Sequence, residues 1–188
     1  MTTTERPLRA DAQRNLERII ASARTLFAEQ GAQAQMEDIA AHAGVGIGTL
    51  YRRFPTKESL MTALVRERFQ EFAVIAEEVE RTTDPADALA TVMRRHAEAV
   101  ENDAAFQLAM MNLESFHWEG IEEDKTVLRA TIARIIARGK KAGAVRANLQ
   151  ADDYGVLMCS TTAAMYFVTD KSAWRRQQEV MLAGLRPD

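Results

Sequence analysis

Apolar residues recur at intervals of three and four positions along most of the chain, which is the pattern of amphipathic α-helices. The first such stretch runs from Arg14 to Gln30, and Gly31 ends it. Its apolar positions are Leu16, Ile19, Ile20, Ala23, Leu26 and Phe27. The pattern predicts further helices over about 57–81, 84–101, 103–116, 125–142, 154–168 and 172–185. Because glycine and proline are sparse, at nine and four residues, we expect an all-α protein.

Residues 35–60 have the pattern of two short helices joined by a tight glycine turn. Gly44 lies where the first helix must end, and glycine adopts the left-handed conformation of a helix end without steric cost. The apolar positions are Met36, Ile39 and Ala40 in the first helix, and Ile47, Leu50 and Phe54 on one face of the second. This arrangement predicts a helix-turn-helix, whose second helix can enter the DNA major groove.

Two segments of the chain carry a family resemblance. The second short helix and its flanks read GVGIGTLYRRFPTKESL, and the first predicted helix contains LERIIASARTLFAEQG. Both segments resemble the TetR (tetracycline repressor) family of bacterial transcription regulators, over Arg14 to about Leu64. The resemblance implies an N-terminal three-helix helix-turn-helix domain, followed by a C-terminal helical domain for ligand binding and dimerisation. About nine helices are then expected in all.

The expected domain boundaries follow the breaks in the pattern. Residues 1–13 are polar and predict a flexible arm, and residues 14–56 form the helix-turn-helix domain. Residues 57–188 form the effector-binding and dimerisation domain, in which 57–81 is a connecting helix. Asp84 and Pro85 mark the clearest break, as a helix cap followed by a first helical residue.

Charge and composition agree with an intracellular regulator. The net charge is −3, but residues 1–60 hold eight basic and seven acidic residues, against sixteen and twenty in the remainder. The mildly basic first part favours DNA binding there. The N-terminus has no apolar signal core, and no stretch has the apolar length that spans a membrane. The single cysteine, Cys159, excludes an intrachain disulfide, so we expect a cytoplasmic protein.

The predicted DNA contacts surround the second short helix. Tyr51 and Lys57 are assigned to phosphates by the resemblance, and either Arg52 or Arg53 can read a guanine. Gln35 and Gly46 stand at helix starts where the family commonly has a hydroxyl residue, which removes a cap. The full set is Gln35, Gly46, Gly48, Thr49, Tyr51, Arg52, Arg53 and Lys57. The alternative is that the arginines form an ordinary solvated face and that Tyr51 packs.

The body of the protein is rich in methionine and aromatic residues. The resemblance implies that a small effector binds between its helices, and an apolar lining predicts an apolar or aromatic effector. The candidate lining residues are Phe69, Phe72, Met93, His96, Met110, Met111, Phe116, Trp118, Met158 and Met165. The alternative is that these residues form a plain hydrophobic core, with His96 a hydrogen-bonded core histidine.

The last two predicted helices are the candidate dimer interface. The segment from Tyr154 to Val168 is apolar nearly all round, so it must be covered on every side. Two helices from each chain could then form a four-helix interface. The candidate residues are Tyr154, Leu157, Thr161, Ala164, Met165, Val168, Trp174, Met181 and Leu185. The alternative is that both helices complete the core of a monomer.

Catalytic and metal chemistry have no support in the sequence. His42, His96 and His117 lie far apart, and Cys159 has no acid or base at a useful spacing. No nucleophile elbow, phosphate loop or bound cofactor is predicted. The sequence predicts a homodimeric, ligand-responsive repressor that binds a palindromic DNA operator and is not an enzyme. The alternative is a helical small-molecule sensor with weak or no DNA binding.

Overall fold

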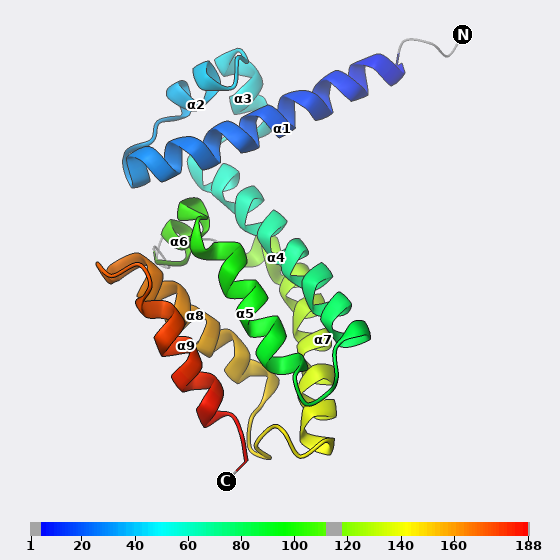
Figure 1. Ribbon diagram of the computed structural model, residues 1–188. Helices are drawn as coiled ribbons and strands as arrows, with labels where there is room; N and C mark the ends of the chain where they lie inside the picture. Colours follow the sequence, from blue (N-terminus) through cyan, green and yellow to red (C-terminus); the bar gives the residue numbers. More distant parts are fainter. Residues whose placement is uncertain (1–4, 112–117, 188) are drawn as a thin grey trace.

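The structure, a computed structural model, describes residues 5–111 and 118–187. Within these residues it consists of α-helices and two short 3-10 turns, with no strand (Figure 1). The helices are α1 (Glu5–Gln30), α2 (Met36–His42), α3 (Ile47–Arg53), α4 (Lys57–Thr82), α5 (Ala88–Glu101), α6 (Ala104–Met111), α7 (Glu122–Lys141), α8 (Ala151–Phe167) and α9 (Ala173–Gly184). The turns are Gly31–Gln33 and Trp118–Ile121. For the described residues, the predicted all-α fold of about nine helices is confirmed.

Helix α1 begins at Glu5 and not at Arg14, so the predicted flexible arm over residues 1–13 is wrong for residues 5–13. Leucine, alanine, arginine, glutamine and glutamate dominate this stretch and favour a helix even without an apolar stripe. Pro7 lies in the first turn, where the N–H that proline lacks has no helical partner anyway. The N-terminal half of α1 extends beyond α2 and α3 (Figure 1).

Helices α1, α2 and α3 and the start of α4 form the N-terminal domain around one apolar core. Its fully buried side chains include Ile19, Phe27, Ile39 and Leu50. Ile47, however, is 41% exposed, so its predicted place on the apolar face with Leu50 and Phe54 is wrong. It is the first residue of a seven-residue helix whose buried side is centred on Leu50.

Two local features fix the geometry of the helix-turn-helix. Gly44 has a φ of 63°, in the left-handed region that favours glycine, and this conformation ends α2 and turns the chain toward α3. After Pro55, Thr56 begins α4 with a reciprocal cap. The Ser59 backbone N–H donates to the Thr56 hydroxyl at 3.1 Å, and the Thr56 N–H donates to the Ser59 hydroxyl at 3.2 Å.

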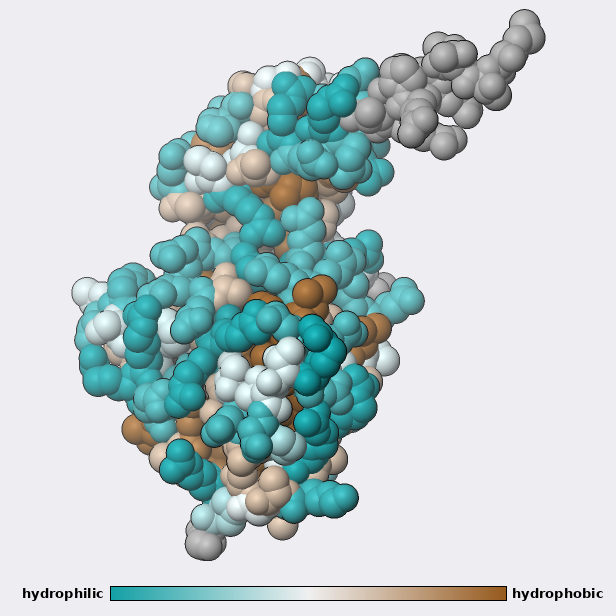
Figure 2. Space-filling model, turned by 45° about the vertical axis from the view of Figure 1, so that its right-hand side comes forward, coloured by the Kyte–Doolittle hydropathy of each residue, from teal (hydrophilic) through white to brown (hydrophobic). Residues whose placement is uncertain are grey.

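Helix α4 leaves the N-terminal domain and continues along the body, where it packs on α5 and α7 (Figure 1). Helix α8 packs on α5, α6, α7 and α9. Beyond α4, the Asp84 carboxylate accepts the Ala86 N–H at 2.9 Å, and α5 starts at Ala88, slightly later than predicted. The space-filling view shows the N-terminal domain as a smaller lobe joined to the body by a narrow neck (Figure 2).

Candidate functional site

Helix α3 presents a polar, basic side to solvent on the N-terminal domain. Gly48, Tyr51, Arg52 and Arg53 are all exposed there, while Leu50 anchors the helix in the core. An added Cβ at Gly48 would meet no atom within 4 Å, so this part of the surface is open. The Arg52 guanidinium lies 3.4 Å from the Thr49 hydroxyl, to which it donates. The structure therefore brings these predicted DNA contacts together on one face, and Ile47 extends that face at its N-terminal end.

The starts of α2 and α3 lack side-chain caps. Gln35 and Gly46 occupy the two N-cap positions, and neither makes a side-chain hydrogen bond to its helix. The Gln35 amide instead donates to the Gln33 carbonyl at 2.8 Å. The first backbone N–H groups of both helices are therefore not satisfied by a side chain at the N-cap, as the residue types predict.

Tyr51 and Lys57, the two predicted phosphate contacts, make contacts inside the chain. The Tyr51 hydroxyl donates to the Glu37 carboxylate at 3.0 Å, which joins α3 to α2, and this hydrogen bond raises the pKa of Tyr51. The Lys57 amine donates to the Ala32 carbonyl at 2.6 Å and lies 5.5 Å from the centre of the Phe27 ring. Burial lowers the pKa of Lys57. In the protein without DNA, both side chains thus stabilise the domain.

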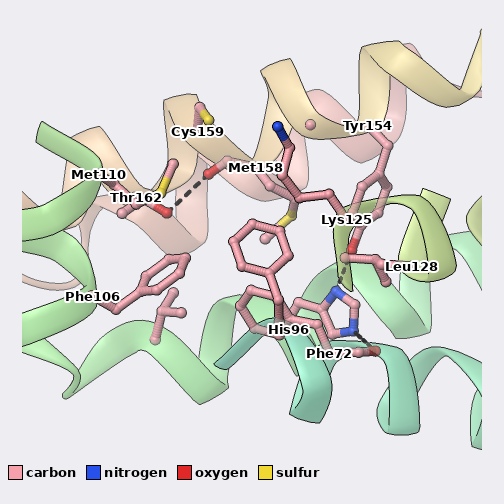
Figure 3. A pocket seen from close by; sticks show the side chains of 13 residues that line it. Phe72, His96, Phe106, Met110, Lys125, Leu128, Tyr154, Met158, Cys159 and Thr162 are labelled. Carbon is pink, nitrogen blue, oxygen red and sulfur yellow. Dashed lines mark hydrogen bonds between the residues drawn. The ribbon is translucent and has the colours of Figure 1, made fainter. Parts of the chain in front are cut away.

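The body contains an apolar pocket of about 340 Å³ between α4, α5, α6, α7 and α8 (Figure 3). Five of the predicted lining residues are found there, namely Phe69, Phe72, His96, Met110 and Met158. The other lining residues are Val100, Phe106, Lys125, Leu128, Tyr154, Gly155, Cys159 and Thr162. The sequence signal for two of these, Tyr154 and Thr162, is their helical spacing from the predicted Met158, which lies four residues from each on one side of α8.

The remaining predicted lining residues do not line this pocket. Met93 and Met165 are buried in the surrounding core, and Met111 packs against that core while partly exposed. Phe116 lies outside the described residues. Trp118 begins the turn before α7, and its side chain lies outside the described part of the structure. Met93, Met111 and Met165 therefore belong to the core around this pocket and not to its lining, and the sequence does not separate the two because core and pocket residues share the same apolar pattern.

His96 and Tyr154 form a hydrogen-bonded pair at one side of the pocket (Figure 3). The His96 Nε2 lies 2.9 Å from the Phe72 carbonyl oxygen. A carbonyl only accepts, so Nε2 carries the hydrogen and donates. Burial lowers the pKa of His96 to about 3, so the ring is neutral and its Nδ1 accepts. The Tyr154 hydroxyl therefore donates to Nδ1, at 2.5 Å, and burial raises the pKa of Tyr154.

The predicted dimer residues fall into two groups. Five of the residues are buried within the chain itself and leave little surface for a second copy to contact, namely Tyr154, Thr161, Met165, Trp174 and Leu185. Leu157, Ala164 and Met181 pack against the same core while partly exposed, and Val168 is 40% exposed. The most exposed apolar side chains of these helices are Val156 (70%) and Phe167 (70%) on α8 and Val180 (74%) on α9.

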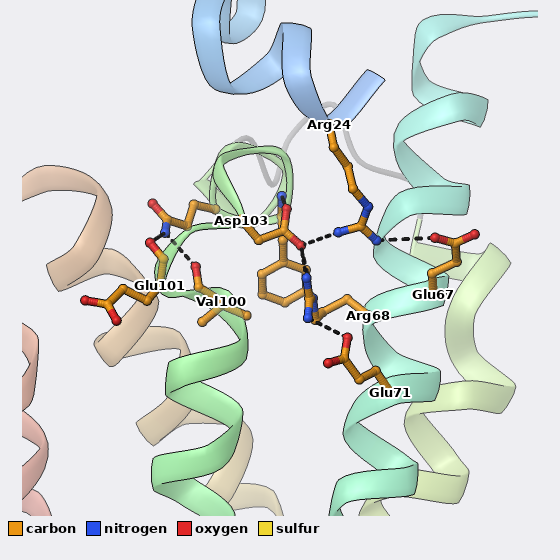
Figure 4. A network of polar contacts seen from close by, with 9 residues as sticks. Arg24, Glu67, Arg68, Glu71, Val100, Glu101 and Asp103 are labelled. Atoms are coloured by element: carbon orange, nitrogen blue, oxygen red, sulfur yellow. Dashed lines mark hydrogen bonds and ion pairs between the residues drawn. The ribbon is translucent and has the colours of Figure 1, made fainter. Parts of the chain in front are cut away.

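A cluster of charged side chains joins the two domains beside the pocket (Figure 4). Asp103, with only 5% of its side chain exposed, accepts from Arg24 of α1 at 2.8 Å and from Arg68 of α4 at 2.6 Å. Its other carboxylate oxygen accepts the Phe106 backbone N–H at 3.0 Å and so caps α6. Glu67 and Glu71 complete the cluster on α4. Because Phe106 and Met110 of α6 line the pocket, this cluster connects the pocket wall to the N-terminal domain.

An exposed basic helix behind a glycine turn is the arrangement of a helix-turn-helix DNA-binding protein, and comparison with known proteins gives the family. Residues 19–64 match the family "Bacterial regulatory proteins, tetR family". Residues 84–187 match the C-terminal domain of SbtR-like transcriptional regulators. The chain belongs to the TetR family of DNA-binding transcription regulators, which are not enzymes. The predicted family is confirmed, and the alternative of a sensor without DNA binding is not supported.

Individual relatives agree with this assignment. A TetR transcription regulatory protein from Mycobacterium vanbaalenii is 30% identical, with a TM-score of 0.66 over 96% of this chain and 100% of that structure. An HTH-type transcriptional regulator from Staphylococcus aureus is 31% identical over 107 residues, or 54% of this chain and 56% of the relative. The chain spans about half the length of the curated relatives that it matches.

One structural neighbour contains a ligand. The transcriptional regulator FadR from Bacillus subtilis, in complex with stearoyl-CoA, is 22% identical. Its TM-score is 0.68, over 90% of this chain and 99% of that structure. At this identity the likeness shows the fold alone. Among the described residues, no helix is both long and apolar enough to cross a membrane.

Proposed function

We propose that this regulator is a ligand-responsive repressor that binds a palindromic operator as a homodimer in the cytoplasm, where the DNA is. The observation that carries the proposal is the direct ion pairing between the two domains. Arg24 of the DNA-binding domain and Phe106 of the pocket wall are both held by the Asp103 carboxylate. An apolar pocket and a DNA-binding face are thus mechanically connected within one chain.

The homodimer is supported by the exposed apolar side chains of α8 and α9. Val156, Phe167 and Val180 are each at least 70% exposed in the single chain, and a second copy would remove them from water. One seven-residue recognition helix reads only a few base pairs, so two copies are needed for a selective site. A two-fold dimer presents its two helices to half-sites of inverted sequence, hence the palindrome.

The pocket supports the role of a small apolar effector. Aromatic and methionine side chains form most of its walls, and its volume of about 340 Å³ lies at the lower end for ligand pockets. The structural neighbour with stearoyl-CoA shows that this fold can hold a ligand with an apolar chain. An effector that binds better to the conformation with low DNA affinity shifts the population toward that state, by no more than its differential affinity.

Selection of bound fragments from the source genome would test the proposal. We expect purified protein to enrich sites with two-fold symmetric half-sites about one helical turn apart. Bound complexes should migrate as dimers on each site, and binding should weaken as salt rises, because phosphate contacts release counterions. Apolar compounds that release the operator should raise expression of a reporter gene placed behind it. Enrichment of asymmetric sites by a monomer would refute the homodimer, and effector-induced tightening would refute release of the operator by the effector.

A further inference from the structure

We infer that the effector is an amphiphile with an apolar tail and one anionic head group, and that it binds tail first with its head beside Lys125. This inference rests on the proposed role of the pocket as the effector site. It follows from three properties of the lining: which polar hydrogens are already used, where the charge lies, and which side is open to solvent.

The interior polar hydrogens of the lining are already donated within the protein. The His96 Nε2–H donates to the Phe72 carbonyl, and the Tyr154 hydroxyl donates to the His96 Nδ1. The Thr162 hydroxyl donates to the Met158 carbonyl at 3.1 Å. A ligand carbonyl or carboxylate placed among these groups would find no strong donor. It would lose its hydrogen bonds to water without replacement, which is costly in an apolar site.

The interior also lacks a counter-charge. His96 stays neutral because both of its ring nitrogens are committed and its surroundings are apolar, with the Phe72 ring stacked on it at 4.5 Å between ring centres. The Tyr154 hydroxyl is likewise neutral, since burial raises its pKa. An anion in the interior would therefore be desolvated and unpaired, which excludes it. The tail of the ligand, and not its charged head, fits beside these two residues.

Lys125 supplies the missing positive charge at the solvent side. Among the described residues that line the pocket, it is the only one with a permanently charged side chain. Figure 3 shows its amine beside α8, on the side of the pocket away from His96. Its side chain is 38% exposed, and on the facing helix Gly155 and Cys159 are exposed as well. This combination places the charge at the opening of the pocket.

A ligand anion can bind Lys125 at small cost to the protein. The Lys125 amine pairs with Glu122 at 2.7 Å, but the Glu122 side chain is 58% exposed. Such exposed pairs contribute little to stability because water screens them. Exchange of Glu122 for a ligand carboxylate or phosphate therefore costs the protein little, and Glu122 returns to water. A free carboxylic acid and its coenzyme A thioester both combine an apolar chain with anionic oxygens, which belong to the carboxylate in the acid and to the more distant phosphates in the thioester.

Calorimetry on the full-length protein tests the inference with four probes that share a ten-carbon chain and differ in the head group. The probes are decanoate, decanoyl-coenzyme A, 1-decanol and decyltrimethylammonium. We expect decanoate or the thioester to bind tightest, and whichever is tighter identifies the source of the head group. Lys125→Gln should weaken that ligand about tenfold, as for the loss of one partly exposed charge-assisted hydrogen bond, and leave 1-decanol unchanged. Lys125→Arg should keep the affinity. Lys141→Gln is the matched control, because Lys141 is exposed on the same helix and lies outside the lining.

Three results would overturn the inference: equal binding of decanoate and 1-decanol by the wild type and Lys125→Gln, preference for the cationic probe, or no binding of any probe. Operator binding, measured separately on the same preparations, distinguishes this failure from failure of the proposed function. If the protein binds a symmetric operator and 1-decanol releases it, the pocket is the effector site and only the inference of an anionic head group is refuted. A protein that binds no operator would refute the regulator proposal whatever its ligands.

Discussion

Replacement of Asp103 by asparagine should uncouple the pocket from the DNA-binding domain and destabilise the fold. The asparagine side-chain oxygen can still accept the Phe106 N–H, which it reaches at 3.0 Å in the wild type, so α6 keeps its cap. The lost group is the negative charge between Arg24 and Arg68. Arg68 keeps only 10% of its side chain exposed and would retain Glu71, at 2.5 Å, as its remaining partner.

The expected cost follows from the burial of this pair. Removing one partner of a buried ion pair costs about 3 to 5 kcal/mol, because the other charge is left without compensation. Glu71 compensates Arg68 in part, although its own side chain is 49% exposed. We therefore expect Asp103→Asn to lower the free energy of unfolding by about 2 to 4 kcal/mol. Glu71→Gln is the control, and its expected loss is below about 1 kcal/mol, since it removes only a half-exposed partner.

Urea denaturation at one fixed protein concentration measures the loss, because the stability of a dimer depends on concentration. Operator affinity should be measured on the same variants with and without an effector that releases wild-type protein. In Asp103→Asn the effector should still bind, while the ratio of the two operator affinities moves toward one. An unfolding free energy within about 0.5 kcal/mol of wild type would refute the reasoning on burial. An unchanged affinity ratio would refute the role of the cluster in coupling.

Three further predictions test the DNA-binding face, the dimer and the buried histidine. The double change Arg52→Ala and Arg53→Ala should lower operator affinity at least about tenfold and make that affinity less dependent on salt, as measured by fluorescence anisotropy. Arg81→Ala, far along α4, should change neither. Unchanged affinity of the double variant would contradict the assignment. Phe167→Glu should shift the sedimentation coefficient to that of a monomer, and Val74→Glu, also exposed but on α4, should leave it unchanged. The pKa of His96 is lowered to about 3 in the folded state. As the pH is lowered through about 6.5, this histidine takes up a proton in the unfolded chain but not in the folded one, so the free energy of unfolding decreases. Between pH 7 and 5 this group should contribute a loss of about 2 kcal/mol, and a pH slope that persists in His96→Asn would show that other groups cause it.

The fold and the exposed basic face of α3 could be predicted because local signals specify them. Gly44, Pro55 and Thr56 set the helix ends through their own backbone preferences, and Leu50 needs only a buried side of its helix. The roles of long side chains could not be predicted in this way. Lys57 could extend toward DNA or fold back on the Ala32 carbonyl, and the residue type allows both. The contact of Tyr51 could not be predicted for the same reason, because its partner Glu37 lies on another helix.

Helix α8 shows where periodicity stops being informative. Its residues are apolar on nearly every side, so the sequence predicts that it is covered all round but does not indicate by which neighbours. Tyr154 and Met165 face α5, α6 and α7 of their own chain, and Val156 and Phe167 are left on the outside. A polar atom provides the missing clue. The Tyr154 hydroxyl needs a buried partner, and His96, on the apolar stripe of α5, is a side chain in the same body that can accept its hydrogen.

Asp103 unites two requirements that the sequence presents as separate. An aspartate directly before a helix is expected as a cap, and an arginine within the buried side of α4 is expected to need a carboxylate. The structure satisfies both with one residue, and adds Arg24 of α1 to the same carboxylate. We expect a ligand that displaces the Phe106 ring to move the first turn of α6 and, with it, this carboxylate. Since one oxygen caps that turn and the other holds the two arginines, the start of α6 cannot shift without changing how α1 is held against the body.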